Sequence, residues 1–194
     1  MNSTTKRLFD ILGSLAGIII FSPLFLIIYI GQKLSYDGPA IYVQERIGLG
    51  GRPFNIYKFR TMVTNSETDG VPQLAEPDDE RLTKFGKFLR SHHLDELPQL
   101  WNVLRGDMSF IGPRPERKYF VDKIIKHDPR YVELYKIRPG ITSYATLYNG
   151  YTDTMEKMLR RLELDLYYLE HRSWTFDLQI LWKTFTSIVF GKRF

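Results

Sequence analysis

Cysteine is absent from the 194-residue sequence. Disulfides, thiolate zinc sites and cysteine nucleophiles are therefore excluded, and a reducing compartment fits this composition. Internal repeats and low-complexity tracts are absent as well. The length and the 43% content of apolar residues suffice for one ordinary domain with a core, or for one domain with an appendage.

An excess of acidic residues is also absent. The sequence contains 27 lysines and arginines and 22 acidic residues, which gives a formal charge of +5. Such a balance suits an anionic partner, which could be a nucleic acid, an anionic lipid or a phosphorylated substrate. The charge alone does not choose between these three classes.

Charged side chains are missing between Ile11 and Gly31, a run about as long as a helix needs to cross a bilayer. A secretory signal is a poor alternative, because the apolar run is too long and no small-residue cleavage site follows it. Ser22 and Pro23 interrupt the run. Since a proline removes one helical hydrogen bond and clashes with the preceding turn, the pair predicts a break in the helix.

Two arrangements of this helix stay open. A straight helix would span the hydrocarbon core, and a proline kink is tolerated within a spanning helix. Alternatively, the helix breaks at Ser22 and Pro23 and returns to its side of origin, with the Ser22 hydroxyl bonded to a carbonyl one turn earlier. Lys6 and Arg7 before the run and Lys33 after it favour re-entry, because basic residues prefer the cytoplasmic side.

Two short strands are expected at residues 41–43 and 54–59, on either side of the glycine-rich stretch 48–51. A phosphate-binding glycine loop is the alternative, but such a loop needs a helix after it, and strand-like residues follow instead. We therefore interpret residues 48–51 as a hairpin turn. The polar, proline-bearing segment 64–80 predicts a loop.

Apolar residues recur at helical spacing in two later segments. In residues 82–90 they alternate with Lys84, Lys87 and Arg90, which predicts a helix with one apolar face and one basic face that is solvated or in contact with lipid. A second helix over residues 97–104 is predicted to end at Gly106.

Asp95 and Glu96 precede the second of these helices. A structural interpretation makes Asp95 an N-cap and Glu96 an acid that complements the helix dipole. Arg90 before the pair and Arg114 in a Pro-Arg-Pro segment after it favour another interpretation, since arginine binds phosphate through two parallel hydrogen bonds. Carboxylates near arginines, beside a membrane helix, indicate phosphoryl transfer at the bilayer surface.

Three other polar residues have structural explanations. His92 and His93 are adjacent, without the spacing of metal ligands, and we interpret both as structural. Asp177 is predicted to cap the helix that follows it. That aromatic and apolar helix, residues 176–190, is either a core helix or one that lies in the headgroup plane.

Five stretches together cover nearly the whole chain: KRLFDILGSLAGIIIFSPLFLI, YKFRTM, LRSHHLDELPQLWNVLRGDMSFIGPRPE, IRPGIT and LELDLYYLEHRSWTFDLQIL. In these stretches the chain resembles the monotopic phosphoglycosyl transferases, a family of bacterial sugar transferases. The resemblance is to the minimal catalytic form of this family. The resemblance implies an α+β, mainly helical fold. It also implies a re-entrant membrane helix over residues 1–33, broken at Ser22-Pro23, and a catalytic domain over 34–194. That domain would have a small β-hairpin, with amphipathic interfacial helices around the active site.

The resemblance also implies a reaction. A sugar-1-phosphate passes from a nucleoside diphosphate sugar, usually a UDP-sugar, to polyprenyl (undecaprenyl) phosphate, with UMP as the other product. Asp95 would be the nucleophile that carries the phosphosugar and Glu96 its partner, with Mg²⁺ at these two carboxylates. The positions expected to bind phosphate or substrate are Arg90, Arg114, Lys58, Arg60 and Asp165.

Location and partners follow from the same resemblance. We expect the bacterial inner membrane, with the anchor in one leaflet and the catalytic domain on the cytoplasmic face. The product would serve glycoconjugate assembly, as in capsule, exopolysaccharide, O-antigen or glycoprotein glycan synthesis. No nucleic acid partner is expected, and a homodimer stays open.

One segment departs from the family. Where many members have a sequence close to GITGWAQVNGR, residues 140–151 contain one additional residue, with Thr146 in place of a glutamine and Tyr151 in place of an arginine. The identity of the sugar is therefore open. Two rival functions also stay open: a membrane-anchored hydrolase of nucleotide sugars, and a non-enzymatic basic adaptor on an anionic membrane, which gives Asp95 and Glu96 no role.

Overall fold

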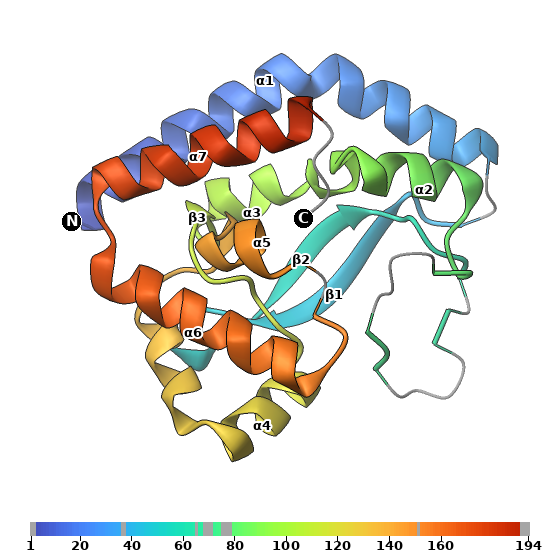
Figure 1. Cartoon of the computed structure of the whole chain (residues 1–194). Helices are drawn as coiled ribbons and strands as arrows, with labels where there is room; N and C mark the ends of the chain where they lie inside the picture. Colours follow the sequence, from blue (N-terminus) through green and yellow to red (C-terminus); the bar gives the residue numbers. More distant parts are fainter. Residues whose placement is uncertain are drawn as a thin grey trace.

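The structure is a computed structural model that describes residues 3–35, 38–64, 66–67, 72–74, 79–150 and 152–190. Helices predominate in these residues, together with two small two-stranded sheets (Figure 1). The predicted α+β, mainly helical fold is confirmed. Most of the loop predicted at 64–80, and the family departure at Tyr151, lie outside the described residues.

Helix α1 (Ser3–Ser35) begins the described chain and contains Pro23 within one continuous helix. Figure 1 shows that α1 is bent along its length, so the expected break takes the form of a bend. Proline is a common cause of such bends, because it removes one backbone donor and its ring clashes with the preceding turn. The hydroxyl of Ser22 donates to the carbonyl of Ile19 at 2.8 Å, which confirms the predicted bond one turn earlier.

The surface of α1 is inverted relative to that of a helix in a soluble protein. Its buried side chains include Asp10, Ser14 and Gln32, whereas Ile19 and Ile27 are 64% and 67% exposed. A helix in water buries its apolar side and exposes its polar side. The outer face of α1 therefore suits hydrocarbon. In the part of the chain that the structure describes, α1 is also the one helix long and apolar enough to cross a membrane.

The predicted hairpin is present. Strands β1 (Ile41–Ile47) and β2 (Pro53–Phe59) pair antiparallel, and the short 3₁₀ helix η1 (Leu49–Gly51) connects them. Gly50 and Gly51 have φ angles of 67° and 70°, in the left-handed region that glycine adopts without steric cost. The glycine-rich stretch is thus a hairpin turn that leads into a strand, as expected.

Both helices predicted after the hairpin are confirmed. They are α2 (Lys84–Ser91) and α3 (Gln99–Arg105), and α3 ends at Gly106, whose φ of 96° favours glycine. The 3₁₀ helix η2 (Leu94–Glu96) lies between them. The structural interpretation of Asp95 as an N-cap is wrong, because Asp95 lies inside η2 rather than at the start of α3.

The second sheet was not anticipated from the sequence. Its strands β3 (Ser109–Ile111) and β4 (Gly140–Thr142) are parallel, and α4 (Lys118–His127) and the 3₁₀ helix η3 (Pro129–Lys136) lie between them in the chain. Three helices complete the described chain: α5 (Tyr144–Asn149), α6 (Met155–His171) and α7 (Trp174–Val189). Apolar side chains of α4, η3 and α6 form one core.

Polar bonds attach α1 to this domain at both of its ends. Near the start, the carboxylate of Asp10 accepts hydrogen bonds from the Ser109 hydroxyl at 3.0 Å and the Phe110 amide at 3.1 Å. Near the end, Nε2 of Gln32 donates to the carbonyl of Arg60 at 2.6 Å. Both arms of the bent helix are therefore attached to the same domain.

Helix α7 runs alongside α1 in Figure 1. Lys6 of α1 forms an ion pair with Asp177 of α7, and the hydroxyl of Tyr168 donates to the same carboxylate at 2.7 Å. The prediction that Asp177 caps a helix is wrong, because the hydroxyl of Ser173 caps α7. Asp177 instead neutralises one of the basic residues that precede the apolar run.

Candidate active site

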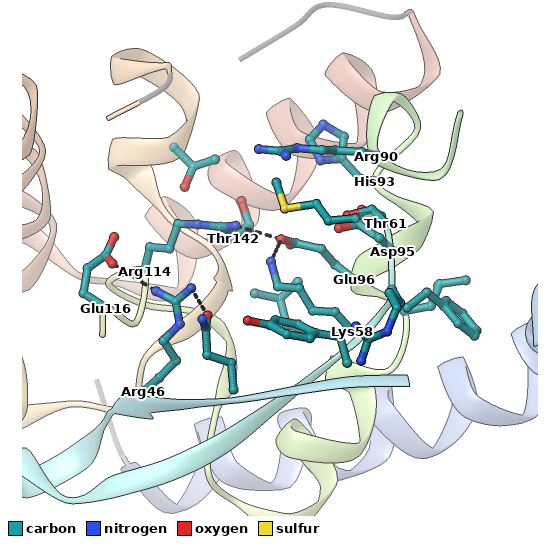
Figure 2. A pocket seen from close by; sticks show the side chains of 18 of the residues that line it. Arg46, Lys58, Thr61, Arg90, His93, Asp95, Glu96, Arg114, Glu116 and Thr142 are labelled. Carbon is teal, nitrogen blue, oxygen red and sulfur yellow. Dashed lines mark hydrogen bonds and ion pairs between the residues drawn. The ribbon is translucent and has the colours of Figure 1, made fainter. Parts of the chain in front are cut away.

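A cavity of about 560 Å³ lies between the hairpin, η2 and the segment that leads from β3 to α4, and Figure 2 shows it from close by. Six of the seven residues that the sequence analysis assigned to the site line it: Lys58, Arg60, Arg90, Asp95, Glu96 and Arg114. The seventh, Asp165, is not among the residues that line the cavity. The fold thus brings distant parts of the chain together at one site.

The direction of η2 depends on His93. This residue has a φ of 55°, in the left-handed region that is uncommon for residues other than glycine. The turn ends α2 and directs the chain so that Asp95 and Glu96 lie on the cavity wall. His93 lines the cavity too, whereas His92 is exposed and bonds through its ring to the carbonyl of Phe88 at 2.8 Å.

Glu96 is the carboxylate that the basic side chains hold. Its Oε1 atom accepts hydrogen bonds from Nζ of Lys58 at 2.6 Å and from Nη2 of Arg114 at 2.7 Å (Figure 2). Burial by itself would raise the pKa of Glu96, but Arg114 and Lys58 outweigh it and hold that pKa well below its usual range. Glu96 is therefore ionised at neutral pH.

Asp95 has a different environment, although it is the adjacent residue. Its side chain is buried, and Lys58 and Arg114 donate to Glu96 rather than to it. Burial raises the pKa of Asp95 to about 6; the charge of Lys58 works against this rise, and that of Glu96 adds to it. Asp95 is thus mostly ionised at neutral pH and keeps its carboxylate outside these two ion pairs, as a nucleophile requires.

Arg90 and Arg60 lie at other parts of the cavity wall. The charge of Arg90, at the end of α2, helps to lower the pKa of Asp95 against the effect of burial. Nε of Arg60 donates to the carbonyl of Pro39 at 2.9 Å, and its guanidinium lies 5.6 Å from the centre of the Tyr42 ring. Both arginines thus add positive charge to the cavity wall.

A second set of ion pairs, around Glu116, was not anticipated from the sequence. Nη1 of Arg46 donates to Glu116 at 3.0 Å, and Arg161 pairs with the other oxygen of the same carboxylate (Figure 2 shows Arg46 and Glu116). Burial alone would raise the pKa of Glu116, but Arg161 and Arg46 lower it to about 2. The sequence feature that could have indicated Glu116 as a site residue is its position, two residues after Arg114 in the Pro-Arg-Pro-Glu segment.

The segment that departs from the family forms another part of the wall. Thr146, at the position where many members have glutamine, lines the cavity from α5. Its hydroxyl is hydrogen bonded to that of Ser143 at 2.8 Å, and Ser143 also caps α5. A substrate group that reaches this wall meets a small hydroxyl side chain rather than a long amide.

The carboxylate pair has the donor chemistry that Mg²⁺ prefers. Mg²⁺ is held through one or two carboxylates together with substrate phosphates, rather than by a cage of protein ligands. Asp95 and Glu96 supply two adjacent hard-oxygen groups. Among the described residues, no group of three or more histidines, aspartates or glutamates could hold a metal ion. The pair therefore fits a site that is completed by phosphate oxygens.

Comparison with known proteins gives a consistent result. The sequence profile described as bacterial sugar transferase matches residues 1–191. One relative is a UDP-N-acetylgalactosamine-undecaprenyl-phosphate N-acetylgalactosaminephosphotransferase of Aeromonas hydrophila, to which the chain is 43% identical over 186 residues. These aligned residues make up 96% of the chain and 44% of the Aeromonas protein.

Two further relatives are named UDP-glucose:undecaprenyl-phosphate glucose-1-phosphate transferase. The protein of Klebsiella pneumoniae is 42% identical over 95% of the chain and 40% of its own length. The protein of Caulobacter vibrioides is 40% identical over 95% of the chain and 69% of its own length. The chain thus spans less than half the length of the Aeromonas and Klebsiella proteins.

Proposed function

Because the chain belongs to the bacterial sugar transferase family, we propose that it transfers a sugar-1-phosphate from a UDP-sugar to undecaprenyl phosphate and releases UMP. One observation carries the proposal. Two adjacent carboxylates, Asp95 and Glu96, lie in one cavity with Lys58, Arg90 and Arg114. This combination suits a diphosphate, whose charge the cations offset while a carboxylate attacks.

In the first half-reaction, a carboxylate oxygen of Asp95 attacks the phosphorus atom that bears the sugar. An oxygen–phosphorus bond forms, the anhydride bond breaks, and its electron pair leaves with UMP. Arg90 and Arg114 offset the charge that develops on the leaving phosphate. Glu96 stays ionised and keeps Lys58 and Arg114 in place, because their donors are already directed at it.

In the second half-reaction, a phosphate oxygen of the lipid attacks the same phosphorus atom. The bond to Asp95 breaks and its carboxylate is restored, and the product is the polyprenyl-diphosphate sugar. Neither half-reaction needs a proton to be removed from its nucleophile, since both nucleophiles are anions. The two carboxylates would hold Mg²⁺, which when bound supplies positive charge against the diphosphate.

The apolar surfaces of α1 and α7 support a membrane location. The exposed apolar side chains on the two helices include Ile19, Ile20 and Ile27 of α1 and Leu178, Trp182 and Phe185 of α7. Spacings of four and three residues put the three of α7 on one side, whereas Ile180 on the other side is in the core. Patches of this kind mark a surface that is covered by another apolar phase.

The α1 anchor re-enters the face from which it came and stays in one leaflet. Its first arm is attached through Asp10 and its second through Gln32, and both attachments are to the same domain. A helix that spans the bilayer would place these two ends on opposite sides. The bend that includes Pro23 allows the central isoleucines to reach hydrocarbon while both ends stay at the surface. The domain then lies on the cytoplasmic face of the inner membrane, where UDP-sugars are available to a glycoconjugate pathway.

The deciding experiment is a transfer assay on the purified protein in detergent. A panel of UDP-sugars is supplied with undecaprenyl phosphate and Mg²⁺, and UMP release is measured together with sugar in the lipid phase. We expect UMP and lipid-linked sugar in equal amounts for at least one UDP-sugar. Release of free sugar phosphate at the same rate without lipid would instead identify a hydrolase, and no release with any donor would support an adaptor.

A further inference from the structure

Asn102 of α3 is a polar side chain in the core of the protein. It is fully buried, and the next residue, Val103, packs with Ile56 of β2 in an apolar cluster. A buried amide costs free energy unless its donors and its acceptor are hydrogen bonded, so packing alone would favour an apolar residue here. The hydrogen bonds of Asn102 therefore indicate its role in the fold.

The amide of Asn102 pairs with the hairpin as a third strand would. Its Oδ1 atom accepts a hydrogen bond from the backbone N–H of Tyr57 at 3.1 Å, and its Nδ2 atom donates to the carbonyl of Asn55 at 2.7 Å. Tyr57 and Asn55 are two positions apart on β2, so these backbone groups point to the same edge of the strand. Strand β1 pairs along the other edge.

The orientation of this amide is fixed by further bonds. Nδ2 of Asn102 also donates to the carboxylate of Asp107 at 3.3 Å. The carbonyl of Asn102 accepts hydrogen bonds from the amides of Gly106, Asp107 and Met108 at 3.1, 3.0 and 3.2 Å. Asn102 is thus held at its backbone and at its side chain, which leaves the amide little freedom to turn away from β2.

The contact to β2 lies beside the ion pair of the candidate active site. Lys58 follows Tyr57 on β2, and its Nζ atom donates to Glu96 at 2.6 Å (Figure 2). Glu96 ends η2, and α3 with Asn102 follows shortly after it in the chain. The segment from η2 to α3 is therefore joined to β2 at two adjacent residues, by Glu96 at Lys58 and by Asn102 at Tyr57.

Of these two contacts, the one made by Asn102 determines the register of β2. A lysine side chain is a flexible stem that carries a point charge, so an ion pair tolerates a shift of the strand. Two bonds to backbone groups do not, because a shift of β2 by one residue would present groups that point to the opposite edge. The ion pair between Lys58 and Glu96 forms in the register that Asn102 sets.

On the basis of the proposed function, we infer that Asn102 is a positioning residue that acts through Lys58. Its amide holds β2 where Nζ of Lys58 reaches Glu96, and so keeps one of the two bonds that hold this carboxylate. Asn102 does not touch the substrate, because it is fully buried and is not among the residues that line the cavity.

The alternative is that Asn102 only stabilises the fold. Replacement of a merely stabilising residue lowers the stability of the protein but leaves the interaction between Lys58 and Glu96 unchanged. Replacement of a positioning residue changes that interaction itself. The energetic coupling between Lys58 and Glu96 therefore separates the two roles, and it is measured without any enzymatic assay.

The test measures the coupling between Lys58→Met and Glu96→Gln by denaturant unfolding in detergent, in the wild type and in Asn102→Leu. In the wild type the two substitutions should depart from additivity by roughly fivefold or more in the unfolding equilibrium constant. In Asn102→Leu this factor should fall below roughly twofold. An undiminished coupling in Asn102→Leu, or no coupling in the wild type, would overturn the inference.

Gln99→Leu is the matched control. Gln99 is also a buried amide on α3, but its Nε2 atom has no hydrogen-bond partner among the described residues. Its replacement should leave the coupling between Lys58 and Glu96 at the wild-type value. Asn102→Ala, which removes the same bonds, replaces the leucine variant if that variant does not fold. If neither variant folds, Asn102 serves the fold as a whole and the inference is wrong.

Hydrogen exchange at the Tyr57 amide tests the contact itself. This amide should be protected in the wild type and in Gln99→Leu, and should exchange at least roughly tenfold faster in Asn102→Leu. Equal protection of the Tyr57 amide in all three proteins would contradict the positioning role.

UMP release then connects the contact to the reaction. Asn102→Leu should lower kcat roughly 10- to 100-fold in the wild type, a loss typical of a misplaced catalytic contact, and should lower it little further in Lys58→Met. An equal loss in both proteins would mean that Asn102 does not act through Lys58. A wild type that releases no UMP would refute the proposed function, whereas the unfolding and exchange measurements would still decide whether Asn102 positions Lys58.

Discussion

Lys58 of β2 and Glu96 of η2 form an ion pair of 2.6 Å that connects the hairpin to the short helix carrying both carboxylates. Both side chains are largely buried, at 19% and 12% exposure. Because Arg114 donates to the same oxygen of Glu96, both cations are directed at this residue and neither of these two bonds is made to Asp95, the nucleophile of the proposed mechanism. We therefore expect the adjacent carboxylates to have separate tasks.

The first prediction separates these tasks. Asp95→Asn should abolish UMP release even without acceptor lipid, because the nucleophile is lost, whereas Glu96→Gln should keep traces of activity. Asp95→Asn should unfold at the same temperature as the wild type or higher, since a neutral amide is easier to bury than an acid. Trapping with radiolabelled UDP-sugar and peptide mapping should locate the label on the peptide that contains Asp95. Full activity of Asp95→Asn would refute the mechanism.

The second prediction concerns the shape of Arg114. Arg114→Lys retains the charge but loses the planar fork, which contacts Glu96 and in the proposed mechanism also binds phosphate. We expect UMP release to fall roughly 10- to 100-fold, with little change in the unfolding temperature. The exposed Arg130→Lys is the control and should leave the rate unchanged. Near-normal turnover of Arg114→Lys would show that charge alone suffices.

The third prediction concerns the coupling between Lys58 and Glu96. Lys58→Met should lower the free energy of unfolding by about 1–3 kcal/mol, because Glu96 loses one of its two donors. In the Lys58→Met protein, Glu96→Gln should lower the free energy of unfolding by less than it does in the wild type. The coupling energy between the two substitutions should be about 1 kcal/mol or more.

The exposed pair of Arg130 and Glu163 is the matched control for this cycle. Both of its side chains are more than half exposed, so its coupling should stay below about 1 kcal/mol. Denaturant unfolding in detergent measures all these variants. Equal coupling in the two cycles would mean that the cavity pair contributes no more than a surface pair.

The fourth prediction is a pH dependence of stability that arises from Glu116. Its pKa is about 2 in the folded protein and near 4.5 when unfolded, because Arg161 and Arg46 favour its ionised form. A lowered pKa contributes stability that is fully present above pH 4.5 and is lost as the pH falls toward 2, up to about 3 kcal/mol.

Glu116→Gln should therefore be less stable than the wild type at pH 7, and the gap should narrow at pH 3. Thermal unfolding at both pH values measures the difference in stability between the wild type and Glu116→Gln. The other acidic groups contribute equally to both proteins, so their effect cancels in this difference. A gap that stays constant between pH 7 and pH 3 would contradict the assignment.

The fifth prediction concerns the bend in α1. Pro23→Ala restores a backbone donor and removes the clash with the preceding turn, so it should shift α1 toward a straight helix that spans the bilayer. Since the chain contains no cysteine, a single cysteine in place of Ser3 reports on the topology without a background. Impermeant maleimide should leave it unlabelled in intact cells and label it more in the Pro23→Ala variant. Labelling of the parent protein in intact cells would mean that α1 spans the membrane.

Much of the architecture followed from local patterns in the sequence. The uncharged run around Pro23 indicated a membrane helix with a break, and the glycines at 48–51 indicated a hairpin turn. Helical spacing and Gly106 indicated α3. These features depend on neighbours along the chain, where periodicity and turn preferences act directly. The adjacent acids and the Pro-Arg-Pro segment likewise marked the site, because their chemistry is readable in a few consecutive residues.

The tertiary structure alone decided which groups meet. No local pattern pairs Lys6 with Asp177, 171 residues away, or Lys58 with Glu96 rather than with Asp95. A buried charge takes whichever partner the packing of distant elements brings within hydrogen-bonding distance, and no local pattern records that choice. Short motifs thus determined which residue types the site contains, and the fold decided which of them form ion pairs with one another.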